Sequence, residues 1–167
     1  MSNKAKIYLY KAGNECSSVS GGWETPSGGT YDGTSTGTIT FEKRSDCMYT
    51  RIVANSSSGH TYNQHNKTAV KFTYFDRIYL DADIGHSDQY DRGYISIKNG
   101  EKKVIDGCRY TLKASTDLPR QTFEFNIESA SSGYVCCSPA TVWSGKWGEF
   151  ILYNCYSIPD WMYKFQS

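Results

Sequence analysis

The chain has 167 residues with 18 basic and 17 acidic side chains, a formal net charge of +1, and is long enough for about one domain around one core. A charge so close to zero offers no overall source for the counterion release that drives nucleic-acid binding. No stretch approaches the roughly 18 apolar residues of a membrane span, and no basic segment followed by an apolar run precedes Ile7, so we expect a soluble protein, made in a cytoplasm, without nucleic-acid or membrane partners.

Alternation of β-branched or aromatic residues with polar ones recurs along nearly the whole chain, which is typical of half-buried β-strands. No window keeps the i, i+3, i+4 spacing of a helix without an interruption by Gly, Pro or a β-branched run. The pattern predicts an all-β fold, an antiparallel, jelly-roll-like β-sandwich of about ten strands with little or no helix, as a single domain over 1–167. In chain order the predicted strands are 6–11, 38–43, 48–54, 69–73, 77–84, 93–98, 102–105, 108–114, 122–128 and 149–155.

Two segments indicate which side chains face the core. In 122–128 the odd positions are apolar, so Phe123 and Phe125 are predicted to be buried and Glu124 to face water. From Val70 to Ile84 the even positions keep one apolar phase for longer than a usual strand, which predicts a corner near Phe75-Asp76.

Turn-forming residues lie between the predicted strands. Asn99-Gly100 separates two alternating segments and is a strong hairpin signal. Asp106-Gly107 predicts a second turn, between 102–105 and 108–114.

Four aspartates follow one another from the end of 77–84, and their oxygens are of the kind that bind calcium. The spacing is not that of an EF-hand, because the sixth position is His86 and the twelfth is Arg92. We expect a solvated turn and no cofactor, with a calcium site as the alternative. The candidate ligands are Asp81, Asp83, Asp88 and Asp91.

No convincing catalytic set emerges from the sequence. Gly33–Gly37 has the letters of a nucleophile elbow but lacks the helix that must follow it. Glu124 and Glu128 share a face at roughly 13 Å, beyond the working separations of a glycosidase pair. Glu124 with Glu149 or Glu42 remains open. We expect no enzyme activity, and six cysteines in apolar contexts without an export signal are expected to be reduced thiols, mostly buried.

Aromatic residues carry the positive signal for recognition, since 14 tyrosines and 4 tryptophans combine stacking faces with polar tips. Trp143, Trp147 and Tyr134 are the predicted carbohydrate-binding platform, against the alternative that Trp147 and Trp23 close the ends of the sandwich. The end of the chain is too apolar for a free tail, so it is predicted either to close the barrel as a last strand or to form an assembly interface with a neighbouring subunit. Its residues are Trp161, Met162, Tyr163 and Phe165.

Two segments resemble a known family. The run from Ile7 to Cys16, followed by Gly21-Gly22-Trp23, resembles the start of small virion-associated β-sandwich modules of phages and prophages of Gram-positive bacteria, and 75–81 resembles their central strand pair. The resemblance implies a jelly-roll-like sandwich in a phage tail, baseplate, fibre or capsid accessory position, and it supplies no catalytic residues.

The residues and the resemblance together predict a non-catalytic structural protein of a phage or phage-tail-like particle, located in the virion. Its predicted partners are other copies of itself, in symmetric arrangement, and neighbouring virion proteins. The alternative is a carbohydrate-binding module for host cell-wall or surface glycans, and the third hypothesis is a jelly-roll glycan hydrolase.

Overall fold

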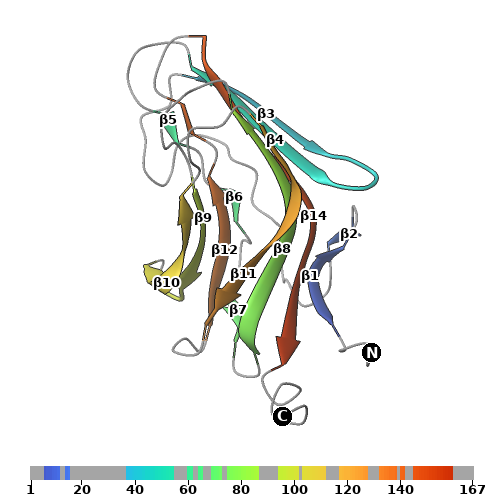
Figure 1. The fold of residues 1–167 in the computed structure, drawn as a ribbon, viewed down its shortest axis with the longest axis vertical. Coiled ribbons are helices and arrows are strands. Elements are labelled where there is room, and N and C mark those ends of the chain that lie inside the picture. The colour runs from blue at the N-terminus through green and yellow to red at the C-terminus, as the bar shows by residue number, and fades with distance from the viewer. Residues whose placement is uncertain are drawn as a thin grey trace.

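The structure is a computed structural model, and it confirms the all-β prediction. It describes residues 6–11, 14–15, 37–54, 60–61, 64–65, 69–72, 75–86, 94–101, 103–111, 117–127, 132–138, 140–141 and 145–159. The regular elements in these ranges are all strands, packed as two facing antiparallel sheets (Figure 1). Over the same ranges there is no helix of the length and apolar character needed to cross a membrane.

The large sheet has seven strands. Its centre is the long β14 (Trp147–Pro159), flanked on one side by β8 (Phe75–His86) and then by β11 (Asp117–Asn126). On the other side β14 pairs along its first half with β4 (Met48–Ala54), which continues to β3 (Gly37–Lys43). Along its second half it pairs with β1 (Ile7–Lys11), which continues to β2 (Asn14–Glu15).

This change of partner makes the large sheet fork. Leu152 pairs with Met48 of β4, whereas Asn154 pairs with Lys11 of β1. The register of β14 against β8 shifts between Leu152 and Asn154, so Tyr153 is the extra residue of a β-bulge. Figure 1 shows the β3–β4 hairpin diverging from β1 and β2 beyond this point.

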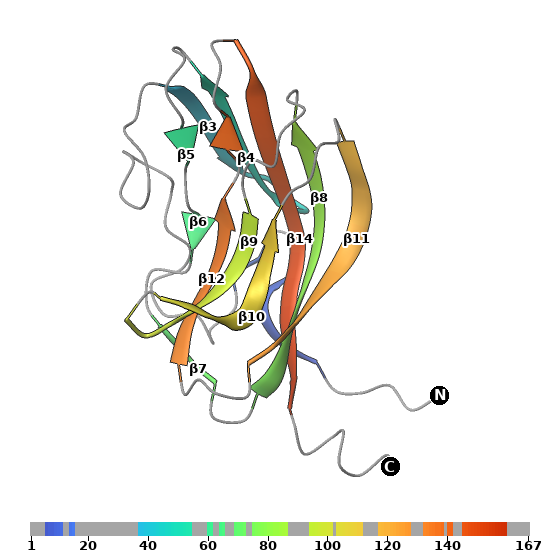
Figure 2. The ribbon, with the colours of Figure 1, turned by 60° about the vertical axis from the view of Figure 1, so that its left-hand side comes forward.

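The small sheet has the order β10 (Val104–Thr111), β9 (Tyr94–Asn99), β12 (Ser132–Ser138) and β6 (Gln64–His65), with β7 (Val70–Lys71) also paired to β12. Figures 1 and 2 show this sheet packed across one face of β8 and β14. A separate two-stranded ladder joins β13 (Ala140–Thr141) to β5 (His60–Thr61).

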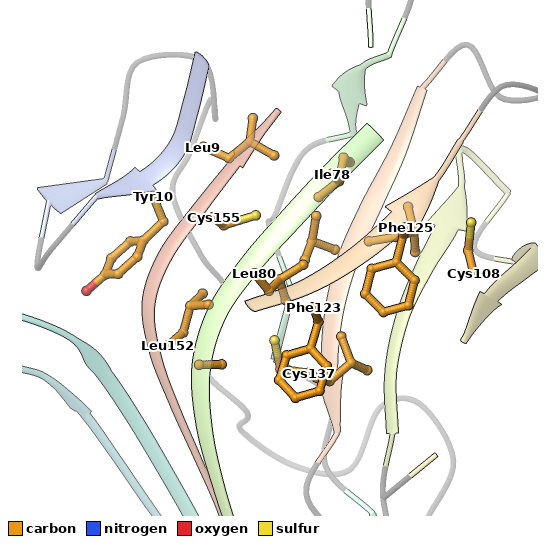
Figure 3. Close-up of a cluster of buried hydrophobic side chains, with 14 of the residues drawn as sticks. Leu9, Tyr10, Ile78, Leu80, Cys108, Phe123, Phe125, Cys137, Leu152 and Cys155 are labelled. Carbon is orange, nitrogen blue, oxygen red and sulfur yellow. The ribbon is translucent and has the colours of Figure 1, made fainter. Parts of the chain in front are cut away.

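The core lies between the two sheets and follows the predicted phases. Along β8 the even positions from Ile78 to Ile84 are buried, and along β11 Phe123 and Phe125 are buried while Glu124 is exposed, as predicted. Figure 3 shows Ile78, Leu80, Phe123 and Phe125 gathered with buried side chains from both sheets. The predicted corner lies earlier than Phe75-Asp76, because the chain leaves the small sheet after Lys71 and Phe75 is already the first residue of β8 in the large sheet.

Five cysteines contribute buried side chains to the interior: Cys47, Cys108, Cys136, Cys137 and Cys155. Desolvation raises the pKa of Cys108 to about 11, with a smaller contribution from the nearby Asp106 carboxylate. Burial likewise raises the pKa of Cys137 well above its ordinary value. The prediction that the cysteines are mostly buried is confirmed for these five, while Cys16 lies outside the described residues.

The prediction of a turn at Asp106-Gly107 is wrong. The two strands predicted on either side are one strand, β10, with a register shift between Val104 and Arg109. Gly107 has a φ of 74°, a left-handed conformation that glycine adopts without steric cost. The glycine therefore forms an irregularity inside the strand instead of ending it.

The hairpin predicted at Asn99-Gly100 is confirmed, and the Asn99 side chain holds it together. Its Oδ1 accepts hydrogen bonds of 3.0 Å from the backbone N–H groups of both Glu101 and Lys103. The backbone N–H of Asn99 donates to the carbonyl of Lys103 at 2.8 Å.

Replacing Asn99 by Ala is expected to lower the free energy of unfolding by about 1 to 2 kcal/mol, because two backbone donors lose their acceptor. Asn99→Asp keeps an acceptor oxygen at the same place and should recover most of the loss. Urea denaturation of the three proteins checks this, and equal losses in Asn99→Ala and Asn99→Asp would contradict it.

Candidate functional site

The outer face of the large sheet, turned away from the core, carries a group of aromatic side chains. Strand alternation places Tyr79 and Tyr156 there, since both sequence neighbours of each are buried. Five of the aromatic side chains are partly buried, and the sixth, Tyr49, is buried more deeply, with 9% of its surface exposed. The six aromatic residues placed on this face are Tyr8, Tyr49, Tyr79, Trp147, Tyr153 and Tyr156.

Three of them form a continuous row across adjacent strands. Tyr8 of β1 lies opposite Tyr156 of β14, and Tyr156 lies opposite Tyr79 of β8. The rings of Tyr156 and Tyr79 are stacked, with centroids 5.2 Å apart and planes 12° from parallel, and those of Tyr8 and Tyr156 are 5.7 Å apart at 55°. We call Tyr8, Tyr156 and Tyr79 the tyrosine row.

The two ends of the tyrosine row differ in charge. At the β11 end, Glu124 lies opposite Tyr79, accepts a hydrogen bond from its hydroxyl at 3.2 Å and pairs with Arg77 at 2.6 Å. At the β1 end there are two lysines: the Nζ of Lys6 lies 4.4 Å from the Tyr156 ring centroid, and the Nζ of Lys11 lies 4.7 Å from that of Tyr8. One end is therefore a neutralised ion pair and the other is cationic.

A second cluster lies beside the tyrosine row, at the β-bulge. Arg120 of β11 reaches across β8 and donates two hydrogen bonds to the carboxylate of Asp81, of 2.9 and 2.8 Å. Its guanidinium carbon lies 3.8 Å from the ring centroid of the bulged Tyr153. Asn154 donates a further hydrogen bond to Asp81 at 2.9 Å. We call Arg120, Asp81, Asn154 and Tyr153 the arginine cluster.

The carboxylate of Asp81 is firmly ionised in this setting. The hydrogen bonds from Arg120 lower its pKa more than partial burial raises it, and the Asn154 amide lowers it further. Both Asn154 and Tyr156 are on β14, so the arginine cluster lies one step along the strands from the tyrosine row. Aromatic surface and fixed hydrogen-bonding groups are thus neighbours on one face.

The other half of the face, toward the start of β14, also has a hydrogen bond from a tyrosine to a carboxylate and guanidinium groups over aromatic rings. The hydroxyl of Tyr49 donates to Glu149 at 2.8 Å, and desolvation, followed by that hydrogen bond, raises the pKa of Tyr49. The guanidinium carbon of Arg51 lies 5.0 Å from the Trp147 ring centroid, and that of Arg44 lies 4.0 Å from the Tyr49 ring centroid.

The glutamates considered as a hydrolase pair lie far apart. Glu124 pairs with Tyr79 and Glu149 with Gly85, six residues further along β8 and so roughly 20 Å away. Glu42 is four strands from Glu124 and four residues further along β8, roughly 23 Å away, beyond the separation of about 6.5 to 9.5 Å used by inverting glycosidases.

The structure does not bring the predicted carbohydrate platform together. Trp147 is half-buried on the outer face of the large sheet, whereas Tyr134 is on β12 of the small sheet, where it lies opposite Lys98 and alternates with the buried Val135. The two residues therefore lie on opposite sides of the molecule. Trp143 lies outside the described residues, as do the predicted interface residues Trp161, Met162, Tyr163 and Phe165.

The predicted calcium ligands are only partly described. Asp81 and Asp83 are both on the outer side of β8, and Asp81 is engaged by Arg120. Asp88 and Asp91 lie outside the described residues. Within the part of the chain that the structure describes, no three metal-ligating side chains come together.

Sequence reasoning missed the tyrosine row and Arg120. The signal was present for one member, because the even phase of 77–84 already left Tyr79 facing outward with Asp81. The alternation did not indicate Tyr156, because this residue lies beyond the predicted end of the last strand at residue 155.

Comparisons with known proteins show a likeness of fold. No protein-family model matches the chain, and no curated protein matches it. Among solved structures, the enzymatically active domain of tailspike protein 4 from bacteriophage CBA120 is similar, with a TM-score of 0.51 and 10% identity. The match covers 76% of this chain but only 18% of the tailspike chain, and at this identity it concerns the fold alone.

Carbohydrate-binding modules are also among the similar structures. A mutant of CBM29-2, a family 29 module, has a TM-score of 0.44 and 9% identity over 93% of this chain and 91% of the module. The CBM22-1 xylan-binding domain of Paenibacillus barcinonensis Xyn10C has a TM-score of 0.42 and 8% identity over 94% of this chain and 97% of the domain. With TM-scores this low, neither module carries an inference about the function of this chain.

Proposed function

We propose that this chain is a non-catalytic carbohydrate-binding module and that the outer face of the large sheet is its binding surface. The observation that carries the proposal is the gathering of six aromatic side chains on that one face, interleaved with charged and amide groups. The solvent side of an antiparallel sheet is ordinarily polar, and a large aromatic patch at a surface marks a binding site.

The chemistry of the face suits a saccharide. A sugar ring has apolar C–H surfaces and a rim of hydroxyl groups, so it needs aromatic carbon and fixed hydrogen-bonding groups close together. The tyrosine row offers the aromatic carbon. The hydrogen-bonding groups beside it are the Asn154 amide, the Asp81 carboxylate and the Arg120 guanidinium. Because these groups already hold one another in place, little side-chain entropy remains to be lost on binding.

A role on a phage particle is the second candidate, and the resemblance of the first strand and of 75–81 supports it. Tyrosine, tryptophan and arginine also dominate the binding energy of protein interfaces, so the same face suits a neighbouring virion protein. Co-sedimentation with particles separates the two candidates: a protein that co-sediments with particles and binds no glycan supports the second candidate alone.

The test of the proposed function is the double substitution Tyr79→Ala with Tyr156→Ala. We expect it to weaken glycan binding about tenfold to thirtyfold, because the two stacked rings are the centre of the aromatic surface. Affinity electrophoresis against a panel of soluble polysaccharides and solubilised Gram-positive cell wall provides the measurement.

Tyr134→Ala is the matched control, since it removes a half-buried tyrosine from the outer side of the small sheet. It should leave binding unchanged, and thermal melting should show all variants folded. If no glycan of the panel binds, or if the double variant binds as well as the parent, the proposal fails.

A further inference from the structure

We propose that the saccharide bound by this face is acidic, with its carboxylate or phosphate group held by Lys6 and Lys11 at the β1 end of the tyrosine row. This inference rests on the proposed function and names the class of its ligand.

The cations of the face fall into two groups, those with a carboxylate partner and those over an aromatic ring, and Arg51 over Trp147 belongs to the second. Three arginines have carboxylate partners: Arg77 pairs with Glu124, Arg120 with Asp81 and Arg44 with Glu42. In contrast, neither Lys6 nor Lys11 forms an ion pair with any carboxylate of the described ranges. Their ammonium groups lie over tyrosine rings instead.

The surface around the tyrosine row is consequently positive on a protein that is nearly neutral. The tyrosine row itself holds three cations, Lys6, Lys11 and Arg77, against the carboxylate of Glu124, a local charge of 3 − 1 = +2. In the neighbouring arginine cluster Asp81 balances Arg120, and the carboxylates of Asp83 and Asp46 also act on Tyr153. The next carboxylate along β8 is Asp83, two residues and roughly 7 Å further from the row.

The two lysines also lie over neighbouring rings of the tyrosine row. They come from the same strand region and flank the ring pair Tyr8–Tyr156, one ammonium over each ring. A cation over an aromatic face keeps N–H donors that can turn to an incoming anion, and the ring contact restricts where the flexible side chain goes. A sugar on the tyrosine row would therefore bring a carboxylate or phosphate substituent to the β1 end, away from Glu124.

The experiment compares saccharide polymers that carry a carboxylate, a phosphate or no charge. Affinity electrophoresis is run with polygalacturonate, with its fully methyl-esterified form, and with a phosphomannan, using polyglutamate as a polyanion that is not a saccharide. The proteins are the parent, Lys6→Gln with Lys11→Gln, and the charge-preserving Lys6→Arg with Lys11→Arg. The control Lys103→Gln with Arg109→Gln removes two positive charges from β10 and the hairpin before it, in the small sheet.

We expect the parent to bind polygalacturonate or phosphomannan at least tenfold more tightly than the methyl ester and polyglutamate. The double Gln variant should lose about fivefold to tenfold of this affinity, as two partly exposed ion pairs would give. The Arg variant and the small-sheet control should bind like the parent. Comparison of the carboxylate polymer with the phosphate polymer shows which of the two anionic groups the site prefers.

Other outcomes overturn the inference in distinguishable ways. Equal binding of the ester and the acid, or full binding by the double Gln variant, overturns it and leaves the proposed function standing if the tyrosine variant still loses binding. Equal binding of polyglutamate shows general ion exchange and also overturns it. Binding of no saccharide, charged or neutral, removes the proposed function together with the inference.

Discussion

Replacing Phe125 by Ala is expected to lower the free energy of unfolding by about 3 to 5 kcal/mol. Phe125 is 5% exposed and lies on β11, the edge strand of the large sheet, opposite Ile78 of β8. Figure 3 shows its ring pointing into the space between the sheets, toward Cys108 of β10. Removing the ring leaves a cavity where the two sheets meet, in addition to the lost burial of apolar surface.

Chemical denaturation of Phe125→Ala beside Glu124→Ala provides the measurement. Glu124 is the neighbouring residue on the same strand, and its side chain is 45% exposed and pairs with Arg77 at the surface. Its loss should change stability little, because exposed ion pairs contribute little. Similar losses in the two variants would mean that β11 does not present this face to the core.

Replacing Gly133 by Ala is expected to cost more than about 3 kcal/mol, at the upper end of the effects of overpacking. Gly133 is on β12, opposite Asn99 of β9 on one side and Val70 of β7 on the other. A Cβ at this position would fall on the backbone carbonyl of Lys98 and lie 2.7 Å from Cε2 of Phe72. The carbonyl belongs to the backbone of the neighbouring strand, so relief requires β9 and β12 to separate.

Gly100→Ala is the matched control. A Cβ there would lie 3.1 Å from the hydroxyl oxygen of Ser132, at the end of a side chain that can turn aside. Thermal and urea unfolding should therefore show a small change for Gly100→Ala and a large loss, or failure to fold, for Gly133→Ala. A Gly133→Ala protein as stable as the parent would show that the two strands do not approach this closely.

Several strands could be predicted because one of their sides faces the core and the other faces water. β4 begins and ends where the alternation does, and β11 has its predicted phase, with Phe125 in and Glu124 out. β12 was not predicted, since Val135, Cys136 and Cys137 are all buried and leave no alternation. In β1 the register shift between Tyr8 and Tyr10 buries the consecutive residues Leu9 and Tyr10, against a simple alternation.

The candidate site was only partly predictable, because its residues come from strands that are distant in the chain. The abundance of tyrosine and tryptophan indicated aromatic recognition, and Trp147 does lie on the aromatic face. The tyrosine row, however, joins Tyr8, Tyr79 and Tyr156 from three strands distant in the chain. Residue type alone could not select these three from 14 tyrosines.

By itself, the sequence determined that this protein is built from strands and, for the regularly alternating ones, which side chains enter the core. That information is local, because neighbouring residues of a strand point to opposite faces whatever lies beside it. Only the tertiary structure decided which strands are neighbours. It also decided where the pairing partner of β14 changes from β4 to β1, and which outward side chains meet there. Strand pairing is set by the packing of two sheets over a shared core, and the bulge at Tyr153 and the ring stack of Tyr79 on Tyr156 follow from that pairing.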